Sequence, residues 1–150
     1  MTTTTDSTVQ IALSLDAAHR AHFLALASAG RASLAYARRL VHIRTADHAD
    51  YVRALPCGDQ DAEFDRTESL RTAADFAWSL AESLRASIVA TQPKAYHFGW
   101  GCAVLGTAKS ARFAVEAVQN RRDTNALPAL VQLLQIVEEN LDAACADYEL

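Results

Sequence analysis

The segment from Glu68 to Ile88, ESLRTAADFAWSLAESLRASI, constrains the fold most because its apolar residues recur at steps of three and four. A side chain returns to the same face of an α-helix at this interval, so the spacing predicts one buried helix face. The residues that carry the pattern are Leu70, Ala73, Ala74, Ala77, Leu80, Ala81, Leu84 and Ile88. A helix of this kind needs other helices to cover its apolar face, and we therefore expect a helical bundle.

Three further segments show helical periodicity. The first has its expected core at Phe23, Ala27, Gly30, Leu34, Ala37 and Val41. The second has it at His97, Gly101, Val104, Ala108, Ala111, Val115 and Val118. The third has it at Leu127, Leu130, Leu134, Val137, Leu141, Ala144 and Tyr148.

Turn signals separate these segments and set the expected helix ends. Pro56, Gly58 and Asp59 precede a helix that we expect from near Asp61 to about Thr91, and a polar stretch over 120–125 precedes one that starts near Asn125. Short connections between helices of similar length imply antiparallel neighbours. We predict an all-α fold, an up-down-up-down four-helix bundle.

The first helical segment starts near Asp16, with Ser14 or Asp16 as its cap, and its spacing continues past Val41 into Arg44 and His48. An unbroken helix from there to Ala54 would greatly exceed the mean length of about 11–12 residues. Either this helix breaks near Thr45–Asp47, with Asp47 capping a second piece and Asp50 in its first turn, or Arg44 and His48 line a polar end of the core. We favour the break.

Composition is consistent with one domain. The chain has 150 residues, of which 51% are apolar, and a chain of this length buries a sizeable core without metals or disulfides. We expect a disordered polar tail over residues 1–12 and a single helical domain over 13–150. The tail lacks the basic and apolar regions of a secretory signal, and we expect a cytoplasmic protein of bacterial type.

No residue constellation matches a known catalytic or cofactor signature. Cys57, Cys102 and Cys145 are odd in number and far apart, which indicates free thiols. In the segment from Gly101 to Ser110 two residues separate Gly106 from Lys109, whereas a phosphate-binding loop needs the lysine directly after the glycine. We therefore expect no cofactor and favour a protein that is not an enzyme, although an enzyme with an unrecognised site stays open as a third possibility.

The charges are unevenly distributed along the chain. Between Ala17 and Ala46 there are five arginines and no acid, namely Arg20, Arg31, Arg38, Arg39 and Arg44. One interpretation is that these arginines pair with acids on neighbouring helices. The other is that they bind a nucleic acid or an acidic partner. We favour the first because the chain is acidic overall, with a formal net charge of −4, and we do not expect nucleic acid as a partner.

A ligand-binding bundle is the main alternative function. The segment from Tyr96 to Trp100 brings aromatic side chains next to His97 and two glycines, Gly99 and Gly101. In an up-down bundle this segment would lie at the same end as His19 and His22. A pocket near His22, Tyr96, His97 and Trp100 could then hold a small molecule, a haem or a metal. The chain lacks the Glu-x-x-His pairs of di-metal bundles, so we expect no metal site.

The heptad over Glu68–Ile88 also predicts an interaction surface. With Leu70, Ala77 and Leu84 at position a, the acids Asp61, Glu68, Asp75 and Glu82 fall at f and face solvent. Four residues fall together at b, and they are Phe64, Arg71, Trp78 and Arg85. A tryptophan in this flanking position is explained if another helix or another subunit covers it. We predict a non-enzymatic protein, for example of a regulatory or immunity type, that binds another protein or itself through these four residues.

Overall fold

The computed structural model describes residues 17–91, 98–121 and 124–150. Within these ranges the protein is all-helical and has no strand, which confirms the predicted class. The α-helices are α2 (Ala17–Ile43), α3 (Ala46–Ala54), α4 (Cys57–Thr91), α5 (Phe98–Asn120) and α6 (Leu127–Asp147), and a short 3-10 helix, η1 (Thr124–Ala126), precedes α6. The described part therefore has five α-helices, not four. The predicted tail and the predicted caps Ser14 and Asp16 lie outside the described residues.

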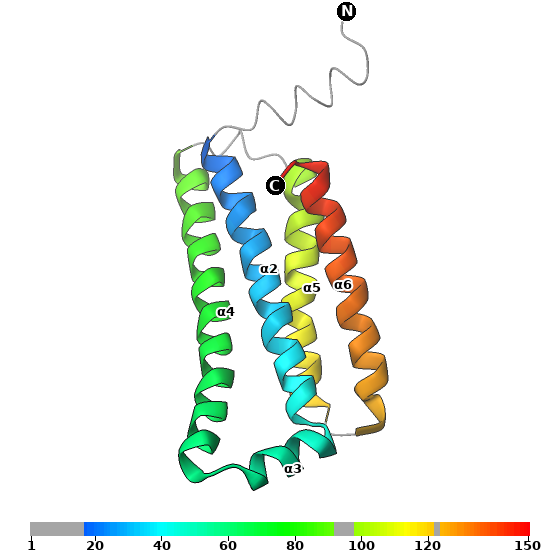
Figure 1. Cartoon of the computed structure of the whole chain (residues 1–150). Coiled ribbons are helices and arrows are strands. Elements are labelled where there is room, and N and C mark those ends of the chain that lie inside the picture. Colours follow the sequence, from blue (N-terminus) through cyan, green and yellow to red (C-terminus); the bar gives the residue numbers. More distant parts are fainter. Residues whose placement is uncertain (1–16, 92–97, 122–123) are drawn as a thin grey trace, which may run out of the picture.

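Four long helices lie side by side, and α3 crosses one end of them between α2 and α4 (Figure 1). The first helical segment does break where the sequence predicts, but Thr45 caps α3 and Asp47 does not. Thr45 has extended backbone angles (φ −73°, ψ 143°), and its hydroxyl accepts a hydrogen bond from the His48 amide at 3.2 Å. Asp47 lies in the first turn of α3, where its negative charge is favourable next to the helix N-terminus.

The helix α4 begins earlier than predicted, at Cys57 rather than near Asp61. The carbonyl of Pro56 accepts hydrogen bonds from the amides of Asp59 and Gln60, at 3.0 and 3.1 Å. Proline is compatible with a helix start because it has no amide hydrogen to satisfy. The residues that indicate a turn in the sequence, Pro56, Gly58 and Asp59, therefore lie at the start of α4 and not in a loop before it.

The helix α2 is the centre of the fold. It packs against α4, α5 and α6, and α5 packs against α6, whereas no Cα of α4 comes within 8 Å of α5 or α6 in the described part of the chain. A close approach at Gly30 permits this packing, because a Cβ there would lie 2.9 Å from Leu141 Cδ2 and 3.2 Å from Ala108 Cα. The backbone of α4 therefore touches only α2 and α3.

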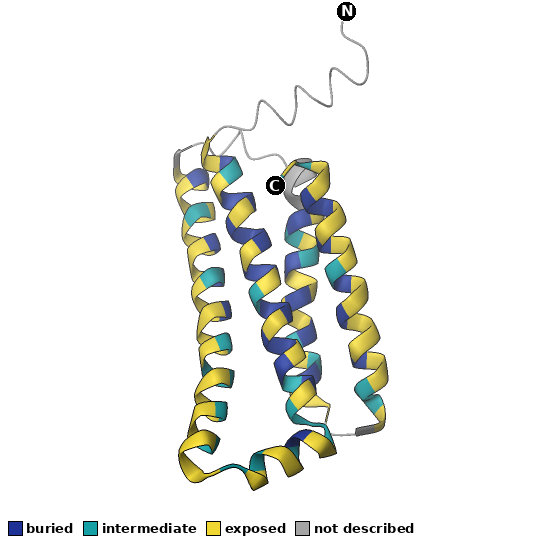
Figure 2. Ribbon diagram, in the orientation of Figure 1, coloured by how far each residue is buried: buried dark blue, intermediate teal, exposed yellow. Residues whose placement is uncertain are grey.

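The predicted core positions of α2 and α6 are confirmed. All six predicted residues of α2 are buried, and those of α6 are buried from Leu130 to Ala144 with Leu127 and Tyr148 half-buried at the ends (Figure 2). In α5, Val104, Ala108, Ala111 and Val118 are buried and Val115 is half-buried. None of the described helices is long and apolar enough to cross a bilayer.

The predicted core face of α4 is partly wrong. Ala73 and Leu80 are exposed, and the buried residues are Ala74, Trp78, Ala81 and Ile88. Because α4 packs on one helix instead of sitting between two, only a narrow stripe is covered and the rest of its apolar face is open (Figure 2). The predicted solvent-facing acids Asp61, Asp75 and Glu82 are exposed, and Glu68 is half-buried.

Candidate functional site

The four residues of the predicted contact surface do not share one open face. Phe64, Arg71 and Arg85 are exposed, but Trp78 is only 6% exposed. The flanking position of this tryptophan predicts cover either by another helix or by another subunit. In the structure, helices of the same chain cover it. Trp78 is a core residue of this chain, and its indole is not available to a partner.

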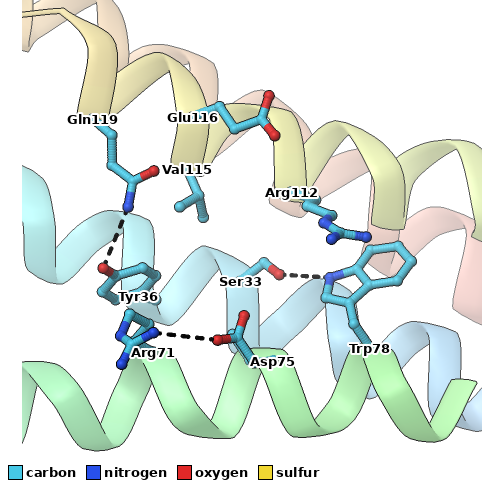
Figure 3. A pocket seen from close by; sticks show the side chains of 10 residues that line it. Ser33, Tyr36, Arg71, Asp75, Trp78, Arg112, Val115, Glu116 and Gln119 are labelled. Carbon is cyan, nitrogen blue, oxygen red and sulfur yellow. Dashed lines mark hydrogen bonds and ion pairs between the residues drawn. The ribbon is translucent and has the colours of Figure 1, made fainter.

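Trp78 connects three helices (Figure 3). Its Nε1–H donates a hydrogen bond of 3.0 Å to Ser33 Oγ on α2, and the Arg112 guanidinium of α5 lies 5.1 Å from the ring centroid. A cation over an indole face is attracted by the ring quadrupole. Although the backbones of α4 and α5 do not meet, these side chains join them.

The space between α4 and α5 is a small polar cleft of about 250 Å³ next to Trp78. Most of its polar groups already have partners: the Arg71 guanidinium donates to Glu68 at 2.8 Å and lies 3.6 Å from Asp75, and Gln119 donates to the Tyr36 hydroxyl at 3.4 Å. The hydrogen bond that Arg71 donates to the Glu68 carboxylate raises the pKa of Arg71. The cleft is smaller than the 300–1,000 Å³ typical of ligand pockets. We do not assign a ligand to it.

The five arginines between Ala17 and Ala46 make contacts within the chain. Arg31 pairs with Asp142 at 2.6 Å, and Arg38 pairs with Glu138, so both bridge α2 to α6. Arg20 and Arg44 donate to backbone carbonyls near the C-terminal ends of α6 and α5. Cations are favourable at the C-terminal ends of helices, where unpaired carbonyls collect. The pairing of the fifth, Arg39, is described below.

The outward side of α4 carries exposed apolar residues, two of which, Ala73 and Leu80, the core prediction places inside. Phe76 is 70% exposed, and Leu80 lies one turn further along on the same side. Beside Phe76 is a shallow hollow with a floor of small side chains, lined by Asp65, Glu68, Ser69, Thr72 and Ala73. A large ring thus stands next to a hollow on one helix.

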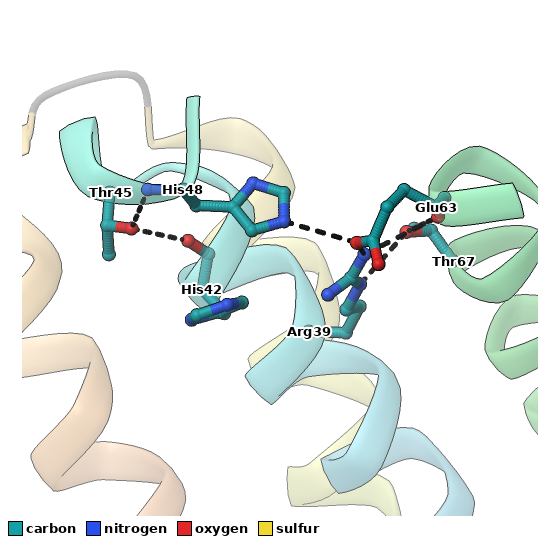
Figure 4. Close-up of polar contacts among 6 residues, drawn as sticks. All are labelled: Arg39, His42, Thr45, His48, Glu63 and Thr67. Carbon is teal, nitrogen blue, oxygen red and sulfur yellow. Dashed lines mark hydrogen bonds and ion pairs between the residues drawn. The ribbon is translucent and has the colours of Figure 1, made fainter. Parts of the chain in front are cut away.

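A buried polar cluster lies where α2, α3 and α4 meet (Figure 4). The Arg39 guanidinium donates to the Glu63 carboxylate and, through Nε, to Thr67 Oγ1 at 3.1 Å. The Nε2 atom of His48 lies 3.5 Å from Glu63 Oε2. Hydrogen bonding from Arg39, with a smaller contribution from His48, lowers the pKa of Glu63 and keeps its carboxylate ionised.

The sequence pointed to only part of this cluster. His48 was placed at a polar end of the core in one of the two interpretations of the helix break, but Glu63 and Thr67 were missed. The available signal was Glu63 and Thr67 four residues apart, one turn of helix, facing an arginine on the preceding helix. Nothing in the spacing alone says that α3 folds back over them.

The alternative ligand pocket is only partly within the described residues. Tyr96 and His97 lie outside them, and the side chain of Trp100 is not described. His22 is 1% exposed, and burial, followed by the nearby charges of Arg85 and His19, lowers its pKa. Across the described ranges, no group of three or more His, Cys, Asp or Glu side chains has a geometry that could hold a metal ion.

The cysteines add no site. Cys57 is an exposed free thiol at the start of α4, and Cys145 is a buried free thiol whose pKa is raised by its burial. The side chain of Cys102 is not described. Raising the pKa of a thiol lowers the fraction of reactive thiolate at neutral pH, so Cys145 is a packing residue.

Comparison of the chain with protein-family models, with curated proteins and with solved structures found no match in any of the three. Any functional assignment therefore depends on the geometry described above.

Proposed function

We propose that this chain is a non-enzymatic four-helix-bundle protein, with α3 as an added cross-piece, that acts through protein–protein contacts and associates with a second copy of itself. The observation that carries the proposal is Phe76, 70% exposed on the outward side of α4 next to a hollow that Ser69, Thr72 and Ala73 line together with two acids. The contact surface that we propose consists of Phe76, Leu80, Ala73, Ser69 and Thr72. It replaces the surface centred on Trp78.

Burial of this surface would be favourable. Removing an exposed Phe or Leu side chain from water contributes about 1.5–3 kcal/mol when the side chain is fully covered. The helix α4 has room for a partner because its backbone meets only α2 and α3 in the described part of the chain. Exposed apolar patches on a protein surface commonly mark protein–protein contact sites.

A two-fold axis fits the arrangement of large and small residues. In a symmetric dimer each residue meets a counterpart on the same patch of the other subunit. We place the axis midway between Ala73 and Phe76, close to the middle of α4 (Cys57–Thr91), so that in an antiparallel pair of α4 helices Phe76 of one chain would lie opposite Ala73 of the other. Leu80 would then lie opposite Ser69. The ring of each chain would enter the hollow of its partner.

The test is the mass in solution of Phe76→Glu, with Phe113→Glu as the matched control. Phe113 is 64% exposed, but it lies on α5, away from the proposed surface. Light scattering coupled to gel filtration should give twice the chain mass of 16.3 kDa for the unaltered protein and for Phe113→Glu, and the single chain mass for Phe76→Glu. A monomeric unaltered protein at all concentrations tested, or equal loss of mass in both variants, would overturn the proposal.

A second candidate function is small-molecule, haem or metal binding near His22, Tyr96, His97 and Trp100. The buried His22 supports it, because its lowered pKa leaves a neutral imidazole at neutral pH. This candidate predicts a chromophore or a bound metal in the purified protein. A featureless visible spectrum together with a blank elemental analysis would remove the haem and the metal from this candidate.

A further inference from the structure

A second hollow lies at the opposite side of α4 from Phe76, in the angle that α2, α3 and α4 enclose. It is a cleft of about 460 Å³, within the range of small-molecule pockets. Its apolar walls are Ile43 from α2, Ala49 and Val52 from α3, and Phe64 at the rim from α4. The cleft exists because α2 and α3 break at Thr45 and α3 turns across the end of the bundle.

One end of the cleft is polar and is formed by Arg39, His48, Glu63 and Thr67 (Figure 4). Arg39 fixes the carboxylate through Glu63 Oε2, and no hydrogen bond from the described residues reaches Glu63 Oε1. The Glu63 side chain is 19% exposed, so a ligand can reach this oxygen, whereas Nε2 of His48 is buried 3.5 Å from Glu63 Oε2 and is closed to a ligand. A hydrogen bond to a charged acceptor such as this carboxylate oxygen is stronger than one between two neutral groups.

The charges at this end are balanced. The guanidinium of Arg39 neutralises Glu63, and Arg53, the other cation that lines the cleft, pairs with Asp50 at 3.0 Å. An anionic or cationic ligand would bring an unpaired charge into an apolar space, which is unfavourable. The ligand that fits is uncharged.

We infer that this cleft binds an uncharged, mainly apolar small molecule that carries one hydroxyl group, such as a phenol. The hydroxyl donates a hydrogen bond to Oε1 of the Glu63 carboxylate. The hydrocarbon part of the molecule packs on Ile43, Ala49 and Val52. This site is distinct from the proposed contact surface, since none of its lining residues belongs to that surface.

The experiment uses 4-ethylphenol as the probe and ethylbenzene as the analogue without a hydroxyl. Titration of the full chain, followed by two-dimensional NMR of the amides, should show saturable shifts in α3 and in the first half of α4. The hydroxyl should improve the dissociation constant by roughly tenfold or more over ethylbenzene, because one hydrogen bond to a charged acceptor is lost in the analogue.

Three variants locate the binding. Val52→Trp fills the cleft and should abolish the shifts, and Glu63→Gln should remove most of the preference for the phenol over ethylbenzene. Asp61→Asn, on the exposed side of α4, is the control and should bind the probe as the unaltered protein does. Circular dichroism spectra check that each variant keeps its helices. If Val52→Trp does not fold, Ala49→Leu serves as a second variant that fills the cleft. Absence of saturable shifts in the unaltered chain, or shifts that persist in a folded filling variant, would overturn the inference.

Discussion

At the scale of single residues, the hydrogen bond between Trp78 and Ser33 is the clearest stabilising polar contact in the core. Both side chains are buried, at 6% and 2% exposure, and the bond is 3.0 Å long. Ser33→Ala leaves a buried indole N–H without a partner, so we expect the free energy of unfolding to fall by about 1–3 kcal/mol. Urea denaturation followed by tryptophan fluorescence measures this loss.

The double variant Ser33→Ala/Trp78→Phe shows whether the hydrogen bond is the cause. Trp78→Phe removes the indole N–H. In that background Ser33→Ala leaves no donor without a partner, so it should lower the free energy of unfolding much less. If Ser33→Ala costs the same in both backgrounds, packing around Ser33 explains the effect and the hydrogen bond does not.

Also at this scale, His22 makes stability depend on pH. The pKa of His22 in the folded protein is below the ordinary value of 6.5. Well above pH 6.5 the imidazole is therefore neutral in both the folded and the unfolded chain, and its protonation does not lower the free energy of unfolding. Below pH 6.5 the unfolded chain takes up the proton first, and stability falls as the pH approaches the lowered pKa. Unfolding by urea at pH 7.5 and pH 5.5 should show a loss for the unaltered protein that is smaller for His22→Leu.

His42→Leu is the control for this experiment, because His42 is exposed. It should keep the full loss of stability between the two pH values. An equal loss in the unaltered protein and in His22→Leu would show that another group titrates.

At the scale of elements, the close packing of α2 on α5 and α6 depends on Gly30. A methyl group there would lie 3.2 Å from the backbone of Ala108 and 2.9 Å from the fully buried Leu141 side chain. Overpacking of this kind costs about 1–3 kcal/mol, more than the 0.5–1 kcal/mol that alanine gains in a helix. We expect Gly30→Ala to lower the free energy of unfolding and its thermal midpoint.

Gly106 is the matched control on α5, since a Cβ there would meet nothing within 4 Å. Gly106→Ala should raise the free energy of unfolding by about 0.5–1 kcal/mol through helix propensity alone. A stabilising effect of both substitutions, measured by urea denaturation, would mean that the helices do not approach each other closely at Gly30.

The helices also show which parts of the fold the sequence predicts and which it does not. Periodicity predicted the buried faces of α2 and α6 because each packs on its neighbours along its whole apolar stripe. It misplaced Leu80 and Trp78 in α4, because a regular apolar pattern does not say how many neighbours a helix has. It could not find the Glu63 and His48 pair, which depends on how α3 folds back after Thr45, and backbone direction after a cap is not encoded by spacing.

At the scale of the whole molecule, the fold is a central helix with unequal cover. The helices α2, α5 and α6 pack on one another, while in the described part of the chain the backbone of α4 meets α2 and the short α3 and carries large apolar side chains on its outer side. The proposed contact surface and the proposed cleft lie on different sides of α4. Self-association uses the Phe76 side, and small-molecule binding uses the Phe64 side. Each can fail without the other.

The proposed contact between two antiparallel α4 helices is tested most directly by exchanging Phe76 and Ala73 and measuring the mass of each variant in solution. If Phe76 of one chain lies opposite Ala73 of the other, then Phe76→Ala and Ala73→Phe should each weaken the dimer, by losing the ring or by filling the hollow. The double variant exchanges the two residues and restores a large side chain opposite a small one. We predict that light scattering gives a dimer for the unaltered protein and for the double variant at a concentration where both single variants are monomeric. A double variant as dissociated as the single ones would contradict the antiparallel α4 contact.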